Sequence, residues 1–245
     1  MLAVPWIAAD DHDSPFPDVE RALTEPDGLL AIGGPLSPAR LEQAYRYGIF
    51  PWFSPQQPVL WWAPSVRAII PPGGMRLNRS LRKRLRQRRY TVTLDDDFAS
   101  VIAGCAAPRR DAEGTWITPA MIQAYRALHD HGIAHSVEVW QSDELVGGLY
   151  GVSLGGAFFG ESMFSRVSDA SKIALAWLSA QIQRWGFDLI DCQMPTEHLE
   201  RLGAQRMPRA AFSRALAATT AQPTRRGPWS VAPDLDPLAV IGANQ

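Results

Sequence analysis

Apolar positions recur with two different periods along the chain, and the changes of period predict its elements. Apolar residues spaced three or four apart predict helices over residues 38–47, 119–131, 169–185, 197–202 and 208–218. Alternating or continuous apolar runs predict strands over residues 29–32, 91–94, 135–140, 145–152, 157–164 and 187–193. Because strands and helices are interspersed, we expect an α+β (mixed α/β) fold.

The composition changes along the chain and divides it into four segments. Residues 1–75 are rich in Pro, Gly and Trp and predict a small N-terminal α+β domain. Residues 76–89 predict a basic amphipathic helix, with Asn78 as its N-cap. Residues 90–220 carry the larger mixed domain. Residues 221–245 contain several prolines and little pattern, so an irregular tail is expected.

The overall composition excludes several classes of protein. Of 245 residues, 46% are hydrophobic and 20% are charged, which excludes a disordered or fibrous chain. The two cysteines, Cys105 and Cys192, are too few for a disulfide framework or a Cys-rich zinc site and favour a cytoplasmic location. The sequence shows no secretory signal and no apolar run of the ~18 residues that a membrane span needs. Nothing requires an oligomer, so a monomer is expected.

The basic segment is the most unusual feature of the chain. It holds eight of the 24 basic residues in 14 positions, without one acid, while its leucines recur every four residues. A run of charge is usually a solvated surface, but a polyanion would relieve its self-repulsion, so we favour nucleic acid. Trp52 and Trp116 lie in turn-like contexts where they could stack on bases, although core packing is the commoner role of a single Trp.

Asp191 and Gln193 are the first candidates for chemistry. If the strand over 187–193 continues through both, their side chains share a face with Cα atoms ~6.6 Å apart. The carboxylate could then accept from the Gln193 amide and orient its oxygen, which is a weak acceptor for the proton of an amine. A polar strand end that only satisfies its own backbone is the competing explanation.

Glu161 stands among Phe158, Phe159, Met163 and Phe164. A carboxylate in such surroundings is costly unless a cation accompanies it. The cation is either an internal Arg or Lys or the ammonium of a ligand whose side chain enters a neighbouring apolar pocket.

Other motifs carry less weight. His129, His131 and His135 lack further ligands and are separated by a break between helix and strand, so no metal site is predicted. None of the Gly-Gly pairs continues into a phosphate-binding motif. Cys192 should point away from Asp191 and Gln193, into the core.

Taken together, the motifs resemble the leucyl/phenylalanyl-tRNA–protein transferase family. The matching stretches are DGLLAIGG (27–34), YGIFPWFS (47–54), GTWIT (114–118), HSVEVW (135–140), LVGGLYG (145–151), GESMFS (160–165) and LIDCQ (189–193). They follow the family's order and span about residues 16–220; in combination they are highly specific.

The resemblance implies a fold, an activity and partners. The fold would be a small N-terminal domain followed by a domain like the GNAT acetyltransferases. The enzyme would transfer Leu or Phe, less often Met, from aminoacyl-tRNA to proteins that begin with Arg or Lys, marking them for N-degron proteolysis. Since the donor is an activated ester, no cofactor, ATP or metal is expected.

The resemblance also implies roles for individual residues. Asp191 and Gln193 would be the catalytic pair, and Glu161 would contact the amine of the aminoacyl group. Trp52 and Trp116 would hold the terminal adenosine. The amino-acid pocket would be lined by Leu149, Phe158, Met163, Leu175, Leu178, Ile182 and Ile190. Acceptor-stem phosphates would meet Arg79, Lys83, Arg84 and Arg86, while Tyr45 and Tyr125 are weaker candidates near the acceptor peptide.

Two other functions also fit parts of the sequence. A coenzyme A–dependent N-acetyltransferase of the same fold would need a glycine-containing pyrophosphate loop, and residues 165–172 contain no glycine. A non-catalytic RNA-binding module would use the basic helix, but would leave Asp191, Gln193 and Glu161 without a task.

Overall fold

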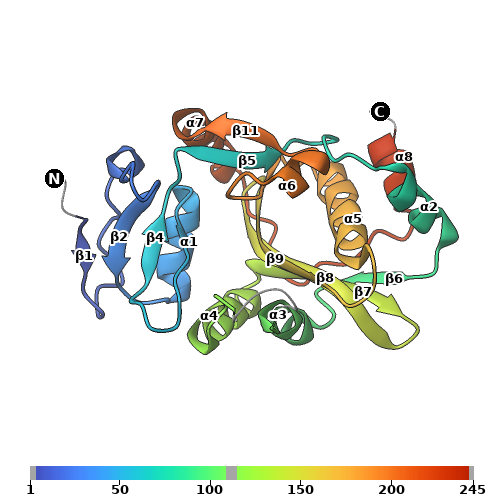
Figure 1. Ribbon diagram of the computed structural model, residues 1–245, viewed down its shortest axis with the longest axis horizontal. Coiled ribbons are helices and arrows are strands. Elements are labelled where there is room, and N and C mark those ends of the chain that lie inside the picture. The colour runs from blue at the N-terminus through green and yellow to red at the C-terminus, as the bar shows by residue number, and fades with distance from the viewer. Residues whose placement is uncertain (1–3, 109–114, 243–245) are drawn as a thin grey trace.

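The computed structural model describes residues 4–108 and 115–242, and its N-terminal part is a small sheet with one helix (Figure 1). The strand order is β1-β2-β4-β3. Only β1 and β2 pair in parallel; the other neighbours are antiparallel. The elements are β1 (Trp6–Ile7), the 3₁₀-helix η1 (Val19–Arg21), β2 (Leu29–Gly33), α1 (Pro38–Arg46), β3 (Phe50–Pro51) and β4 (Leu60–Trp62).

Local signals set both ends of α1. The Ser37 hydroxyl accepts a hydrogen bond from the Arg40 N–H at 3.3 Å, and Pro38 occupies the first helical position. Gly48, with φ of 72°, then turns the chain into β3. A Cβ at Gly48 would lie 2.7 Å from Cε1 of Phe212, so a larger residue would have to displace that ring.

The second sheet has seven strands in the order β11-β5-β10-β9-β8-β7-β6. Among them only β9 and β10 pair in parallel. The strands are β5 (Val66–Ile70), β6 (Thr91–Leu94), β7 (Ala134–Gln141), β8 (Glu144–Leu154), β9 (Ala157–Ser165), β10 (Leu189–Asp191) and β11 (Gln205–Pro208).

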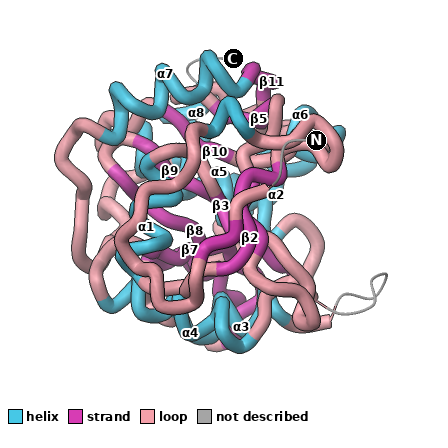
Figure 2. The backbone as a smooth tube through the Cα atoms, turned by 90° about the vertical axis from the view of Figure 1, so that its left-hand side faces the viewer, coloured by secondary structure: helices cyan, strands magenta, loops and turns pink. Residues whose placement is uncertain are grey.

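Helices cover both faces of this sheet, so the larger part has three layers. In Figure 1, α3 (Phe98–Ala106) and α4 (Pro119–Asp130) lie below the strands and α5 (Ala170–Arg184) lies above them. Figure 2, seen from the side of the small sheet, again shows α3 and α4 below the strands. One apolar cluster fills each interlayer space. At Gly147 an added Cβ would lie 2.4 Å from the Ala170 Cβ, so glycine lets α5 begin close to β8.

The boundary between the two parts lies earlier than residue 75, where the composition placed it. β5 (Val66–Ile70) belongs to the large sheet, where it pairs with β10 and β11. Four of its five residues are buried. A strand of this kind carries no local mark of the sheet to which it belongs, because its partners are more than a hundred residues away.

The tail is irregular over residues 221–236, as predicted, but its last described residues are helical. It follows α6 (Glu197–Arg201) and α7 (Arg209–Thr220), and its last described residues form α8 (Pro237–Gly242), which packs on α5. Trp229 is buried, its ring stacks on His135 with centroids 3.6 Å apart, and its backbone N–H donates to Asp95 at 2.7 Å. These contacts fix the tail against the larger domain.

The mixed α/β prediction is confirmed, as are most of its elements. The basic helix is α2 (Arg79–Gln87), and Asn78 caps it by accepting from the Leu81 N–H at 2.8 Å. The pattern of apolar positions did not predict α3, because its small residues carry only a weak periodicity. Within the described residues, no helix is both long and apolar enough to cross a bilayer.

Candidate active site

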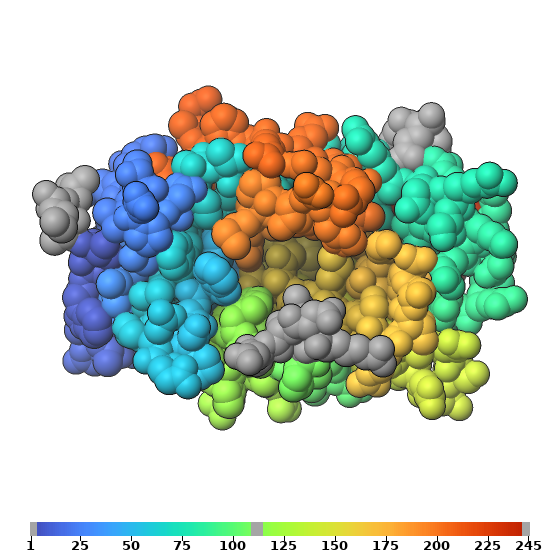
Figure 3. All heavy atoms as spheres, viewed as in Figure 1, coloured from blue at the N-terminus to red at the C-terminus, as the bar shows by residue number. Residues whose placement is uncertain are grey.

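A cavity of about 580 Å³ opens between the two parts of the molecule. Figure 3 shows the hollow on the face toward the viewer, below the orange segment that contains α6. Its walls come from β8, β9, α5, β10 and the segment after β10. Six of the seven residues predicted for an apolar pocket line it: Leu149, Phe158, Met163, Leu175, Leu178 and Ile190.

Ile182 is the exception among the predicted pocket residues. It lies one helical turn beyond Leu178 on α5 and lines a separate, very small pocket with Gly73 and Phe187. Helical spacing put Ile182 on the same face as Leu178, but the cavity ends before that turn. The structure therefore does not bring Ile182 to this cavity.

Both predicted tryptophans lie at the cavity. Trp52 is 40% exposed and packs edge-on against Trp62, with ring centroids 5.8 Å apart. The Trp62 indole N–H donates to the Trp52 carbonyl at 2.7 Å, which fixes the backbone that carries the exposed ring. Trp116, directly before α4, is half-buried and lines the same cavity. Gly114, part of the motif around Trp116, lies outside the described residues.

Asp191, the last residue of β10, is fully buried and does not line the cavity. Its carboxylate receives two hydrogen bonds from the guanidinium of Arg67, one of them from Nε at 3.2 Å. Arg67 also donates to the Gly48 carbonyl at 3.0 Å and lies between the rings of Phe50 and Phe212, at 4.9 and 4.8 Å. Asp191 is thus one half of an internal ion pair, and Arg67 is a site residue that sequence reasoning missed.

Gln193 does not continue the strand. β10 ends at Asp191, and Gln193 has φ of 63°, which is left-handed backbone. Its backbone N–H donates to Oδ1 of Asp191 at 2.8 Å, while its side-chain Nε2 donates to Oε1 of Glu161 at 2.7 Å. The expectation that Asp191 orients the Gln193 amide is therefore wrong: Asp191 holds the backbone of Gln193, and Glu161 holds its side chain.

A β-bulge aims Glu161 at Gln193. Across β8 and β9, Tyr150 pairs with Ser162 and Gly151 with Gly160, so Glu161 is the extra residue between them. Glu161 is 8% exposed and lines the cavity. Within the described residues, Glu161 has no ion-pair partner. Of the two cations considered from the sequence, the internal Arg or Lys is therefore not found beside it.

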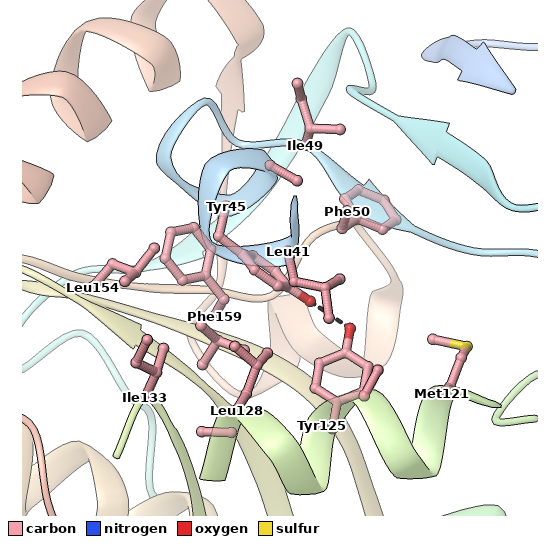
Figure 4. Packing of buried hydrophobic residues seen from close by; sticks show 14 of the residues in the cluster. Leu41, Tyr45, Ile49, Phe50, Met121, Tyr125, Leu128, Ile133, Leu154 and Phe159 are labelled. Atoms are coloured by element: carbon pink, nitrogen blue, oxygen red, sulfur yellow. Dashed lines mark hydrogen bonds between the residues drawn. The ribbon is translucent and has the colours of Figure 1, made fainter. Parts of the chain in front are cut away.

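Two tyrosines support Glu161 from the core side. Figure 4 shows Tyr45 of α1 and Tyr125 of α4 pointing toward each other, and their hydroxyl oxygens are 2.5 Å apart. The Tyr125 hydroxyl donates to Oε2 of Glu161 at 2.8 Å, and Tyr45 also hydrogen-bonds this carboxylate. Both side chains are fully buried and neither lines the cavity. Both hydroxyls face the core and contact the cavity wall through Glu161, and their place near an acceptor peptide stays a prediction.

Burial dominates the electrostatics of Glu161. Burial raises the pKa of this carboxyl, the hydrogen bonds from Tyr45 and Tyr125 and the charge of Arg67 lower it, and the charge of Asp191 raises it. The net pKa is about 7, compared with the ordinary 4.5. Burial likewise raises the pKa of Tyr45 and Tyr125 well above 10. The tyrosines thus stay protonated as donors, whereas Glu161 changes charge near neutral pH.

Cys192 lines the cavity, contrary to its predicted place in the core. Strand alternation ends one residue earlier than expected, so the argument that turned Cys192 inward no longer applies. Burial raises the pKa of its thiol to about 12. Since the thiolate is the nucleophilic form of cysteine, Cys192 is a neutral wall of the cavity. Sequence reasoning also missed several neighbouring wall residues: Phe50, Met194, Thr196, His198 and Leu199.

The basic helix α2 presents most of its charges to solvent. Leu81 is buried, while Arg79, Lys83 and Arg86 are exposed and have no carboxylate within ion-pair distance in the described part of the chain. Its first turn contains no acid, although the N-terminus of a helix favours negative charge. Arg84 differs from these residues because it pairs with Asp169 at 2.8 Å, and Asp169 also pairs with Lys172 at 2.8 Å.

Models of one protein family match most of the chain. The model described as "Leucyl/phenylalanyl-tRNA protein transferase" matches residues 69–217, and the model of its N-terminal domain matches residues 34–65. The gap between the two matches, residues 66–68, falls in the first part of β5, the first strand of the large sheet.

Curated relatives agree with the family models. The leucyl/phenylalanyl-tRNA–protein transferase of Alkalilimnicola ehrlichii is 57% identical over 100% of this chain and 95% of its own length. The protein of that name from Ectopseudomonas mendocina is 58% identical over 85% and 91%. Among solved structures, L-PGS from Bacillus licheniformis has a TM-score of 0.39 at 11% identity, covering 74% of this chain and 64% of that one. So low a score supports no argument, and the GNAT-like fold stays a prediction.

Proposed function

This chain belongs to the leucyl/phenylalanyl-tRNA–protein transferase family, and we propose that its central cavity transfers Leu or Phe, less often Met, from aminoacyl-tRNA to N-terminal Arg or Lys. Transfer of an aminoacyl group from tRNA to protein is the activity that its relatives share by name. The choice of amino acids, the role in N-degron proteolysis and the roles of single residues are the proposal. One observation carries it: the Gln193–Glu161 hydrogen bond lies in the wall of a mainly apolar cavity.

The apolar part of the cavity suits the side chain of Leu, Phe or Met. Leu149 and Met163 face each other across β8 and β9, and Leu175 and Leu178 come from α5. Such walls gain free energy from a buried apolar side chain and disfavour a charged one, whose burial is costly. Trp52 and Trp116 offer rings on which the terminal adenosine stacks.

Glu161 has capacity left for the ammonium of the aminoacyl group. The carboxylate accepts from Gln193 Nε2, Tyr125 and Tyr45, and because a carboxylate offers about four lone-pair sites it can accept a further hydrogen bond. With a pKa of about 7, Glu161 changes between its neutral and ionised forms near neutral pH. An ammonium beside it favours the ionised form.

Gln193 aligns the acceptor amine. Because its Nε2 donates to Glu161, its Oε1 remains as an acceptor for an N–H of the incoming α-amine. An α-amine has a pKa of ~7.7–8.0, so roughly a tenth is already neutral at pH 7 and a strong base is unnecessary. The rate gain comes mainly from positioning the amine against the ester.

The bonds change as in any aminolysis of an ester. The amine nitrogen forms a bond to the carbonyl carbon, and the bond from that carbon to the ribose oxygen breaks. The proton that leaves the nitrogen passes, through water or the neighbouring ribose hydroxyl, to the departing ribose oxygen. Asp191 and Arg67 take part indirectly, because they hold the left-handed backbone of Gln193.

The alternative functions are less well supported. For coenzyme A, the loop from β9 to α5 lacks glycine, and the Ser165 hydroxyl already accepts the Ser171 N–H at 2.9 Å. A passive RNA-binding module would not account for Glu161, whose burial is costly without a ligand to contact.

Transfer of radiolabelled Phe from Phe-tRNA tests the proposal, with one acceptor protein beginning with Arg and another with Gly. We expect label on the Arg-initiated protein only. Gln193→Ala and Asp191→Asn should lower kcat, with tRNA binding nearly unchanged. Gln123→Ala removes an exposed glutamine of α4 and is the matched control. Full activity of both site variants would refute the assigned roles, and no transfer by the wild-type protein would refute the function.

A further inference from the structure

A second cavity, of about 430 Å³, lies on the other side of α5 from the first. Its walls are the C-terminal end of α2, the start of β6, the outer face of α5 and the tail over residues 231–237. The basic helix therefore borders a concave site in addition to presenting a charged face.

The lining of this second cavity combines cations with aromatic rings. Arg88 and Arg89 are exposed and have no ion-pair partner within the described ranges, while Tyr90 and Trp177 are half-buried. Two acids are present as well, but Asp234 pairs with Arg184 at 3.0 Å and Asp236 accepts the Leu238 N–H at 2.9 Å. Arginines without a carboxylate partner, beside partly exposed rings, are a combination that proteins use to bind a nucleotide through its phosphate and its base.

α5 lies between the two cavities and contributes side chains to both. Ser171, Leu175 and Leu178 face the first cavity, whereas Ile173 and Trp177 face the second. An α-helix with side chains is ~10 Å thick, and a nucleic-acid strand with stacked bases advances ~3.4 Å per nucleotide. About three nucleotides therefore span the distance from one cavity to the other. Arg84, which borders the second cavity, pairs with Asp169 directly before α5.

We propose that the second cavity binds one nucleotide of the acceptor strand of aminoacyl-tRNA, a few positions before the terminal adenosine. The base stacks on Trp177, and Arg88 and Arg89 contact the flanking phosphates. This inference rests on the proposed function and adds a second point at which the tRNA, rather than the amino acid, is held. Contacts to phosphate and stacking on a ring do not depend on base identity, so the site serves different tRNAs.

Two aminoacyl donors of different length distinguish binding at the second cavity from binding at the first. Phe-tRNA reaches both cavities, whereas 3′-phenylalanyl-adenosine is long enough for the first cavity only. For Trp177→Ala we expect KM for Phe-tRNA to rise roughly 5- to 100-fold, as the loss of one stacked base does. KM for phenylalanyl-adenosine and kcat for both donors should stay unchanged.

The arginines provide a second and independent variant. Arg88→Ala with Arg89→Ala should lower the slope of log KM against log salt by ~0.7–0.9 for each lost phosphate contact, with Phe-tRNA only. The matched control, Arg214→Ala, removes an exposed arginine on α7, away from α2 in Figure 1. Equal losses with both donors, or no change in KM for Phe-tRNA in either variant, would overturn the proposal. If the wild-type protein used neither donor, the function itself would fail instead.

A fluorescent base identifies the nucleotide. 2-Aminopurine, placed singly at each of the four positions before the terminal adenosine, should be quenched on binding at one position. The quenching should disappear in Trp177→Ala and persist in Arg214→Ala. Quenching that persists in Trp177→Ala at every position would rule out stacking in this cavity.

Discussion

The guanidinium of Arg67 binds both carboxylate oxygens of Asp191, although the two residues are 124 positions apart in the chain. Both side chains are almost completely buried, with 2% and 0% of their surfaces exposed. The same guanidinium donates to the carbonyl of Gly48 in the turn before β3. One side chain thus connects the small N-terminal part, which carries Trp52, with the strand end that carries Gln193.

Variants at Arg67 distinguish its effect on folding stability from its effect on the position of Gln193. Arg67→Met leaves Asp191 as a buried carboxylate without a partner, which costs ~3–5 kcal/mol of folding free energy. Combining it with Asp191→Asn removes that charge, so we expect thermal unfolding to return toward the wild-type temperature while kcat stays low. Calorimetry and single-turnover transfer measure the two quantities. If kcat recovered together with stability, Arg67 would have no positioning role.

The elements that were predictable from the sequence carry their determinants locally. Ser37 and Asn78 cap helices within three residues of themselves, and the leucines of α2 repeat within the same helix. The motifs around Glu161 and Gln193 likewise lie at the walls of one cavity, together with residues of β8, β9 and α5.

What the sequence did not predict depends on distant partners or on where a strand ends. Arg67 occurs in an ordinary apolar strand, and nothing near it indicates a partner on β10. The orientation of Gln193 was missed because strand alternation was extended past Asp191, where the backbone becomes left-handed. The bulge at Glu161 depends on the register between two strands, which a single strand does not reveal.

Glu161 should make folding stability depend on pH. Its pKa in the folded protein, about 7, lies above its ordinary value of 4.5, so the folded state holds the proton more tightly. This stabilisation is fully present below pH 4.5 and is lost as pH rises through 7, by up to ~3 kcal/mol. Relative to Glu161→Gln, the wild-type protein should therefore lose stability between pH 5 and pH 8. Denaturation curves of both proteins at both pH values measure this. If the difference in unfolding free energy between them were the same at pH 5 and pH 8, the raised pKa would be contradicted.

Leu149 should set the size of amino acid that the first cavity accepts. Its side chain is 4% exposed and faces Met163 across β8 and β9. Leu149→Trp fills part of the cavity, so kcat/KM for Phe should fall at least ~10-fold further than that for Leu. Leu149→Ala enlarges the cavity and should spare Phe. Competition between Leu-tRNA and Phe-tRNA measures the ratio, and equal losses for both donors would place the side-chain pocket elsewhere.

The cations of α2 should contribute unequally to tRNA binding. Arg79, Lys83 and Arg86 are exposed and unpaired within the described chain, so each alanine variant should lower the salt slope of tRNA affinity by ~0.7–0.9 where it removes a phosphate contact. Arg84 is already neutralised by Asp169, so Arg84→Ala should change the slope less. Asp169→Asn should then release Arg84 and steepen the slope. Fluorescence anisotropy of labelled tRNA over a range of salt concentrations tests this order, and an equal effect of Arg84→Ala and Arg79→Ala would show that the ion pair opens when tRNA binds.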